Sequence, residues 1–204
     1  MMIVGSPLAG LLITKLGPRV PLVGGMVCTA VAMFGMSQLD TGTGTLTMSL
    51  WFGLLGLGLA PVMVGATEVI VGNAPMELSG VAGGLQQAAM QVGGSLGTAV
   101  LGAVMASQVD SKLAGNWAAA ELPPLSPQQL DQASSAVEVG IPPVASGTPG
   151  PVAEKITSVA HDTFVSGMST AFMVACVVAV IAALVATLTK RGAHAGAGAG
   201  AGHI

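Results

Sequence analysis

The chain has 204 residues, of which 52% are hydrophobic and 7% are charged, with a formal net charge of -3. Soluble globular domains carry about 25% charged residues, so this composition excludes a soluble protein and predicts an all-α membrane protein in contact with lipid. The mean hydropathy of +0.79 agrees with that class. Nucleic acid is excluded as a partner, because six scattered basic residues and no tyrosine provide neither a phosphate-neutralising patch nor a stacking platform.

The first apolar stretch, residues 1–13, reaches about two thirds of the length that a bilayer requires, so it is expected to form a partial helix. Gly17 and Pro18 then break the helix between Lys15 and Arg19. Positive charge in a short loop is typical of the cytoplasmic side. The apolar runs up to Ala106 predict a partial transmembrane bundle over 1–106, with spans at about 1–13, 20–38, 46–72 and 80–106.

The stretch 80–106 contains no charged residue and is long enough to cross a bilayer. Two GxxxG pairs, which let another helix approach closely, are formed by Gly80 with Gly84 and by Gly93 with Gly97. Gln87 and Gln91 add a polar stripe, which is costly against lipid. Two interpretations stay open for this helix: its small residues serve helix packing, or its glutamines line a transport path.

Residues 107–160 are rich in proline and acidic side chains, so an extracytoplasmic solvated loop is expected there. Within it, Ser126 and Gln129 have the spacing of a capping box, and Pro127 occupies the first helical position. This pattern predicts a short surface helix over about 127–139.

The last transmembrane helix is expected over 164–188, and the cations Lys190 and Arg191 after it place the C-terminus in the cytoplasm. The Ala/Gly-rich tail, 189–204, has too little apolar bulk to order and is expected to be disordered. His194 and His203 lack a third ligand, so no metal site is expected.

The chain carries no HExxH motif and no Cys/His pair close in sequence, and no catalytic set is assembled, so neither an enzyme nor a cofactor is expected. Cys28 and Cys176 each lie in an apolar run and are interpreted as small packing residues. Glu68 is the one carboxylate within an expected span. It either reaches the membrane interface, or it titrates a proton or contacts a cation on a transport path.

The sequence GLLITKLGPR resembles the cytoplasmic loop motif of the major facilitator superfamily. Thr14 stands where the family has Asp, and the matching positions are Gly10, Leu12, Lys15, Gly17 and Arg19. The stretch 79–106 is similar to the next-to-last span of the fourteen-span drug and proton antiporters of this superfamily, and 161–188 is similar to their last span.

This resemblance implies that Met1 falls inside the tenth span, so the chain would be the C-terminal part of a proton-coupled multidrug efflux permease, truncated or split. The implied partners are protons, a small amphipathic or cationic substrate, and the missing N-terminal transporter portion, in a bacterial plasma membrane. The alternative hypothesis is a small non-transporting membrane protein that packs against a partner membrane protein through its glycine ridges.

Overall fold

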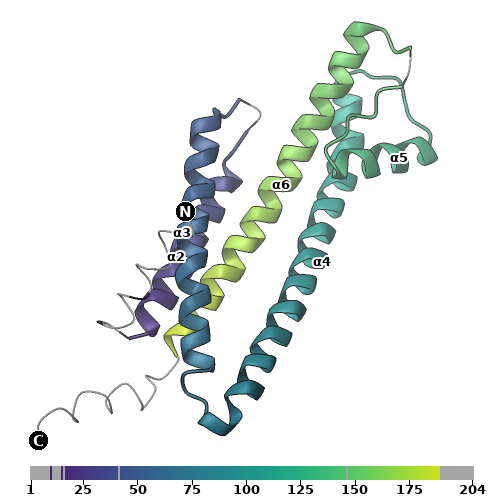
Figure 1. The fold of residues 1–204 in the computed structure, drawn as a ribbon. Coiled ribbons are helices and arrows are strands. Elements are labelled where there is room, and N and C mark those ends of the chain that lie inside the picture. The colour runs from purple at the N-terminus through teal and green to yellow at the C-terminus, as the bar shows by residue number, and fades with distance from the viewer. Residues whose placement is uncertain (1–9, 11–14, 16, 41, 146, 189–204) are drawn as a thin grey trace, which may run out of the picture. The chain divides into compact units, whose positions relative to one another are not determined.

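The computed structural model describes Gly10, Lys15 and residues 17–40, 42–145 and 147–188. The expected partial helix over 1–13, apart from Gly10, and the expected tail over 189–204 lie outside these residues. The described elements are, in chain order, α2 (Arg19–Ser37), α3 (Thr45–Ile70), the 3-10 helix η1 (Met76–Leu78), α4 (Ser79–Ala119), α5 (Pro127–Glu138) and α6 (Gly150–Thr187) (Figure 1).

Four segments are long and apolar enough to cross a membrane: α2, α3, η1 together with α4, and α6. This confirms the expectation of an all-α membrane protein with four full spans. The chain divides into two compact units. The first unit holds α2 up to Phe34, Ser49–Leu96, and α6 from Ala175; the second unit holds Gly35–Met48 and Gly97–Val174.

In the first unit, α2 and α3 pack through small residues. A Cβ built on Gly25 would lie 2.6 Å from the carbonyl oxygen of Gly58, and a Cβ built on Gly58 would lie 2.6 Å from Thr29 Oγ1. Gly65 is also enclosed, though less tightly, because a Cβ there would lie 3.1 Å from Leu22 Cβ. Glycines at these positions let the two backbones approach, as small residues do at helix interfaces in membranes.

In the second unit, α4 continues to Ala119 instead of ending near Ala106, and α6 begins at Gly150 instead of near Phe164. The expected loop over 107–160 is therefore reduced to the segments around α5. The reason is an apolar stripe at helical spacing: Val109, Leu113 and Trp117 are all buried. The first proline after Ala106 is Pro123, so no proline interrupts the helix before it ends at Ala119.

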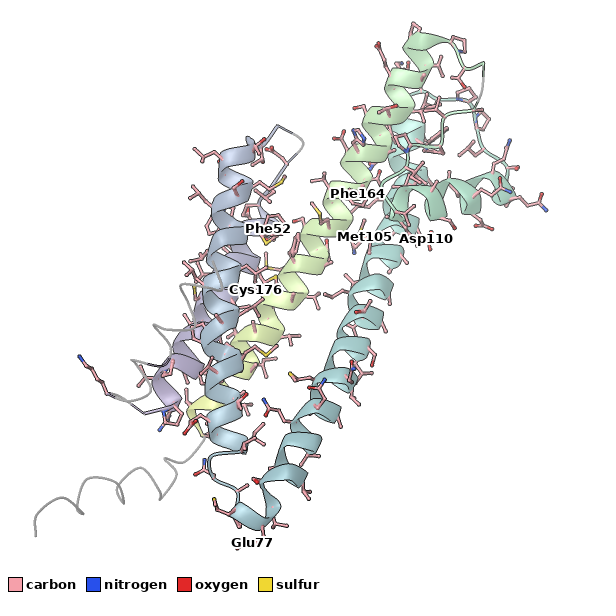
Figure 2. All side chains as sticks on the ribbon, in the orientation of Figure 1. Phe52, Glu77, Met105, Asp110, Phe164 and Cys176 are labelled. Carbon is pink, nitrogen blue, oxygen red and sulfur yellow. The ribbon has the colours of Figure 1, made fainter. Side chains whose placement is uncertain are left out.

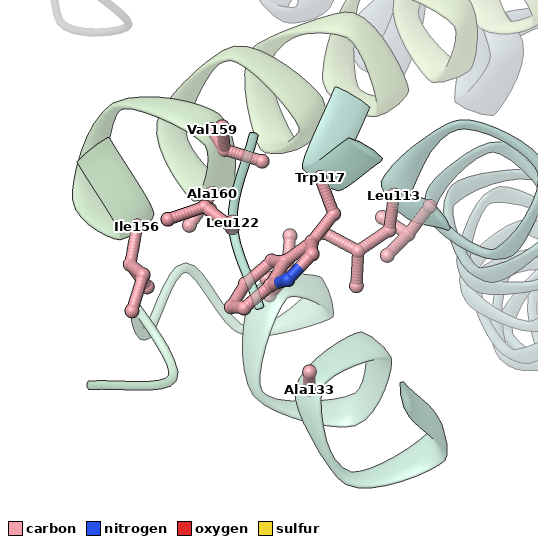
Figure 3. Packing of buried hydrophobic residues seen from close by; sticks show 9 residues of the cluster. Leu113, Trp117, Leu122, Ala133, Ile156, Val159 and Ala160 are labelled. Atoms are coloured by element: carbon pink, nitrogen blue, oxygen red, sulfur yellow. The ribbon is translucent and has the colours of Figure 1, made fainter. Parts of the chain in front are cut away.

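These extensions and α5 enclose a hydrophobic core. Figure 3 shows Trp117 lying among side chains from α4, α5, α6 and the segment after α4. The Trp117 indole Nε1 donates to the Pro123 carbonyl at 2.8 Å, and Asn116 Nδ2 donates to the buried Thr163 hydroxyl at 2.9 Å. The core consists of Val109, Leu113, Trp117, Leu122, Ala133, Val137, Ile156, Val159 and Ala160.

The helix α5 starts with the capping box that the sequence indicates. The Ser126 hydroxyl accepts from the Gln129 backbone N–H at 3.3 Å, and the Gln129 side-chain oxygen accepts from the Ser126 N–H at 2.9 Å. At the other end, Gly140 adopts a φ of +77° directly after the C-cap residue, a conformation that glycine adopts at little cost. Its neighbour in space is the Phe164 ring on α6.

Met105 supplies a further contact between α4 and α6 in the second unit. A Cβ built on Gly167 would lie 2.6 Å from Met105 Sδ, so the glycine makes room for the thioether. Figure 2 shows Met105 and Phe164 on these two helices. A flexible methionine opposite a glycine fills the space between the helices without a branched side chain.

Candidate functional site

The motif turn precedes α2 in the first unit. Gly17 has a φ of +82°, a left-handed conformation that glycine adopts at little cost. The helix α2 starts two residues later, at Arg19. Lys15 and Arg19 are both exposed. The Pro18 carbonyl accepts from the Leu22 N–H at 3.3 Å, and this hydrogen bond connects the turn to the first turn of α2. Leu12 and Thr14 lie outside the described residues, and Gly10 is described as part of a helical turn.

Glu68 lies in the last turn of α3, where its side chain is exposed. Its backbone carbonyl accepts from the Gly72 N–H at 3.1 Å, which ends the helix just beyond the span. One residue earlier, Thr67 donates its hydroxyl to the Met63 carbonyl at 2.9 Å. The Thr67 hydroxyl therefore has its donor engaged within α3 and remains available as an acceptor.

A glutamine of α4 completes this polar group. The Gln86 side-chain amide donates to Thr67 Oγ1 at 2.7 Å and joins α3 to α4 within the first unit. The neighbouring glutamines Gln87 and Gln91, which the sequence indicates as candidates, are exposed instead. The structure thus brings Thr67 and Gln86 together, and Glu68 is the exposed residue that follows Thr67 in the chain. Sequence reasoning overlooked Gln86, because the helical stripe through Gln87 and Gln91 was the stronger polar pattern.

The glycine pairs of α4 have open surroundings. A Cβ built on Gly80, Gly84, Gly93 or Gly97 meets no atom of the described chain within 4 Å. The apolar window of η1 and α4 is 0% buried by the rest of the described residues. Tight contacts of a glycine with another helix are found instead at Gly25, Gly58, Gly65 and Gly167. A GxxxG pattern identifies a smooth helix face but does not say which helix covers it.

The side chains of this site can form polar contacts. No group of three His, Cys, Asp or Glu side chains in the described parts of the chain could hold a metal ion. His194 and His203 lie outside those parts. A carboxylate, a hydroxyl and an amide at the end of a membrane span can accept and donate hydrogen bonds to a proton, a water or a cation.

Comparison with curated proteins identifies relatives of one kind. The chain is 56% identical over 175 residues to the tetracenomycin C resistance and export protein of Streptomyces glaucescens, an alignment that covers 86% of this chain and 32% of that protein. It is 27% identical over 171 residues to the methyl viologen resistance protein SmvA of Salmonella typhimurium, covering 83% and 33%. It is 28% identical over 177 residues to the multidrug resistance protein Stp of Mycobacterium tuberculosis, covering 83% and 32%.

No family model matches the chain, and no solved structure matches it significantly. The chain spans about a third of the length of the curated relatives it matches.

A chain whose described residues include four helices long and apolar enough to cross a membrane is a multi-pass membrane protein. The chain is homologous to drug efflux proteins of the major facilitator superfamily, and it corresponds to a portion of one of them. The relatives are transport proteins, which confirms the expectation that the chain is not an enzyme.

Proposed function

We propose that this chain forms the C-terminal part of a proton-coupled drug efflux permease. The observation that carries the proposal is the 56% identity, over 86% of the chain, to a protein named for resistance to tetracenomycin C and its export. Identity of this extent over 175 residues supports a shared fold and shared helix contacts. The exported compounds would be small amphipathic or cationic molecules, a class that fits the resistance to methyl viologen named for a second relative.

The proposal includes a topology. Lys15 precedes α2, Arg19 is its first residue, and Lys190 and Arg191 follow α6, so an even number of spans separates the two basic clusters. Positive charge in short segments favours the cytoplasmic side. Both clusters would then be cytoplasmic, and α5 with the segments around it would lie on the outer side.

The transport path would pass the polar group of the first unit. Glu68 is exposed and follows Thr67, whose hydroxyl accepts from the Gln86 amide, and Gln87 and Gln91 are exposed on α4. Exposed polar groups in spans are costly against lipid. Their cost is removed if they face a water-filled cavity, as in transporters whose two bundles rock around a central site.

A segment swap tests the proposal. The matching third of the tetracenomycin C resistance and export protein is replaced by this chain, and the hybrid is expressed in a sensitive bacterium. We expect the hybrid to restore tetracenomycin C resistance and export, whereas the exporter lacking the segment restores neither. A hybrid that reaches the membrane in wild-type amount but exports nothing would contradict the proposal.

The second hypothesis, a non-transporting membrane protein, is supported by the open glycines of α4. It predicts that the hybrid fails while the 204-residue chain alone is stable in the membrane. Export by the hybrid would exclude it.

A further inference from the structure

A polar pocket of about 450 Å³ lies within the second unit, between the end of α2, α4 and α6. Its charged lining residues are Asp40, Lys112 and Asp162, all exposed. Its volume falls in the range of about 300–1,000 Å³ that small-molecule sites occupy. The pocket shares no residue with the polar group around Glu68.

Hydrogen bonds between the helices hold the wall of this pocket. The Ser169 hydroxyl donates to the Ser37 carbonyl, so α6 is tied to the end of α2. Lys112 Nζ donates to the Ser166 hydroxyl at 2.5 Å, so α4 is tied to α6. The lysine thus has a neutral partner, and its positive charge is available to a ligand.

The carboxylates are placed on the same pocket. Asp40 Oδ1 accepts from the Gly42 N–H at 3.0 Å and from the Thr43 hydroxyl at 2.8 Å, which holds the Asp40 side chain in the turn after α2. A carboxylate has about four acceptor positions, so Asp40 keeps capacity for a further donor. Asp162 stands one turn before Ser166 on α6.

The three charged residues lie where apolar segments end. Asp40 follows the apolar α2, Lys112 follows the uncharged stretch 80–106, and Asp162 precedes the apolar run of α6. The ends of apolar spans coincide with the headgroup layer of a bilayer. A pocket formed by three such ends is therefore at the depth of lipid headgroups rather than of acyl chains.

We propose that this pocket binds the headgroup of a phosphatidylethanolamine lipid, with its phosphate on Lys112 and its ammonium on Asp40 and Asp162. Opposite charges within one pocket match a zwitterion better than a purely anionic or cationic group. A primary ammonium supplies three N–H donors to the two carboxylates, whereas the quaternary ammonium of a choline headgroup supplies none. Phosphatidylglycerol offers the phosphate and a neutral glycerol, so it has no cationic group for the two carboxylates.

The test uses the purified 204-residue chain with an equimolar mixture of phosphatidylethanolamine, phosphatidylcholine and phosphatidylglycerol of identical acyl chains. Native mass spectrometry measures which lipid the protein retains. We expect phosphatidylethanolamine to be retained over each of the other two by about tenfold. Equal retention of the three lipids, or preference for phosphatidylglycerol, would overturn the proposal.

Charge-neutral variants locate the site. Lys112→Gln and Asp162→Asn should each remove most of the preference, and Asp40→Asn should do so while keeping the Oδ1 acceptor that holds the turn. Lys155→Gln and Asp131→Asn are matched controls outside the pocket and should keep the preference. Variants that unfold with the wild-type midpoint and still prefer phosphatidylethanolamine would refute the assignment.

A last measurement distinguishes binding of a membrane lipid from binding of a soluble molecule. Free phosphoethanolamine carries the same charged groups without acyl chains, and we expect it to displace the lipid only at far higher concentration. Displacement at the concentration of the lipid itself would show that the pocket takes a soluble solute. Because this readout is lipid retention, it is independent of the result of the segment swap.

Discussion

The carbonyl oxygen of Gly58 lies 2.6 Å from the place that a Cβ of Gly25 would occupy, so α2 and α3 meet backbone to backbone. An added methyl group would clash with this oxygen, because it is a backbone atom of Gly58 and cannot move aside as the end of a flexible side chain can. Overpacking of this kind costs about 1–3 kcal/mol. We therefore predict that Gly25→Ala lowers the free energy of unfolding by about that amount, measured by denaturant unfolding in mixed micelles.

The control for this prediction is Gly84→Ala on α4, where an added Cβ meets no described atom within 4 Å. Alanine favours a helix over glycine by up to about 1 kcal/mol, so this variant should be neutral or slightly stabilised. Equal stability of Gly25→Ala and Gly84→Ala would contradict the close approach of α2 and α3.

The open glycine face of α4 predicts a result that depends on context. In the 204-residue chain, Gly93→Leu and Gly97→Leu should leave the unfolding midpoint unchanged, because no described atom lies within 4 Å of an added Cβ. In the hybrid exporter the same leucines should separate backbones that pack there and lower drug resistance. Val100→Leu is the matched control, since Val100 is already a branched side chain and is half exposed. Full resistance in the Gly93 and Gly97 variants would place this face against lipid.

Trp117 should determine the stability of the second unit. The side chain is 7% exposed, and its indole donates to the Pro123 carbonyl. Trp117→Ala should cost about 3–5 kcal/mol through the cavity it leaves. Trp117→Phe should cost less, about 1 kcal/mol for the lost hydrogen bond. The rate of proteolysis between α4 and α6 measures both effects, and the half-buried Trp51→Phe is the control. Cleavage of Trp117→Ala at the wild-type rate would show that the core does not hold this segment.

Glu68 is predicted to affect proton coupling in the hybrid exporter. If it faces the transport path, Glu68→Gln removes an ionisable group and should slow proton-driven efflux of a fluorescent cation from vesicles and change its pH profile. Glu77→Gln, in the turn between α3 and α4, is the control and should leave both unchanged. An unaltered rate and pH profile for Glu68→Gln would return this carboxylate to an interfacial position.

The topology is tested by labelling single cysteines with an impermeant reagent, after Cys28 and Cys176 are replaced by alanine. Ser135→Cys lies on an exposed position of α5 and should be labelled in intact cells. Gly192→Cys, beyond Lys190 and Arg191, should be labelled after the cells are opened. The reverse pattern would invert the topology.

The sequence by itself determined the class of protein and the positions of its apolar spans. Few charges and long apolar runs leave α2, α3 and the apolar part of α6 little alternative to crossing a membrane, because unpaired backbone groups cannot be hydrated in lipid. The start of α5 could also be predicted from the local sequence, since the side chains of Ser126 and Gln129 bond to each other's backbone within one turn. The stripe of Val109, Leu113 and Trp117 was also visible, but the acidic and proline-rich surroundings favoured a loop.

The tertiary structure decided which helix faces meet. Glycines occur along α2, α3 and α4, yet a covered face is found at Gly25 and Gly58 and an open one at Gly93 and Gly97. Gln86 contacts α3 while its neighbour Gln87 is exposed. Helical periodicity states which residues share a face, but the partner of that face is set by the packing of segments distant in sequence, and this is why these contacts could not be derived from local patterns.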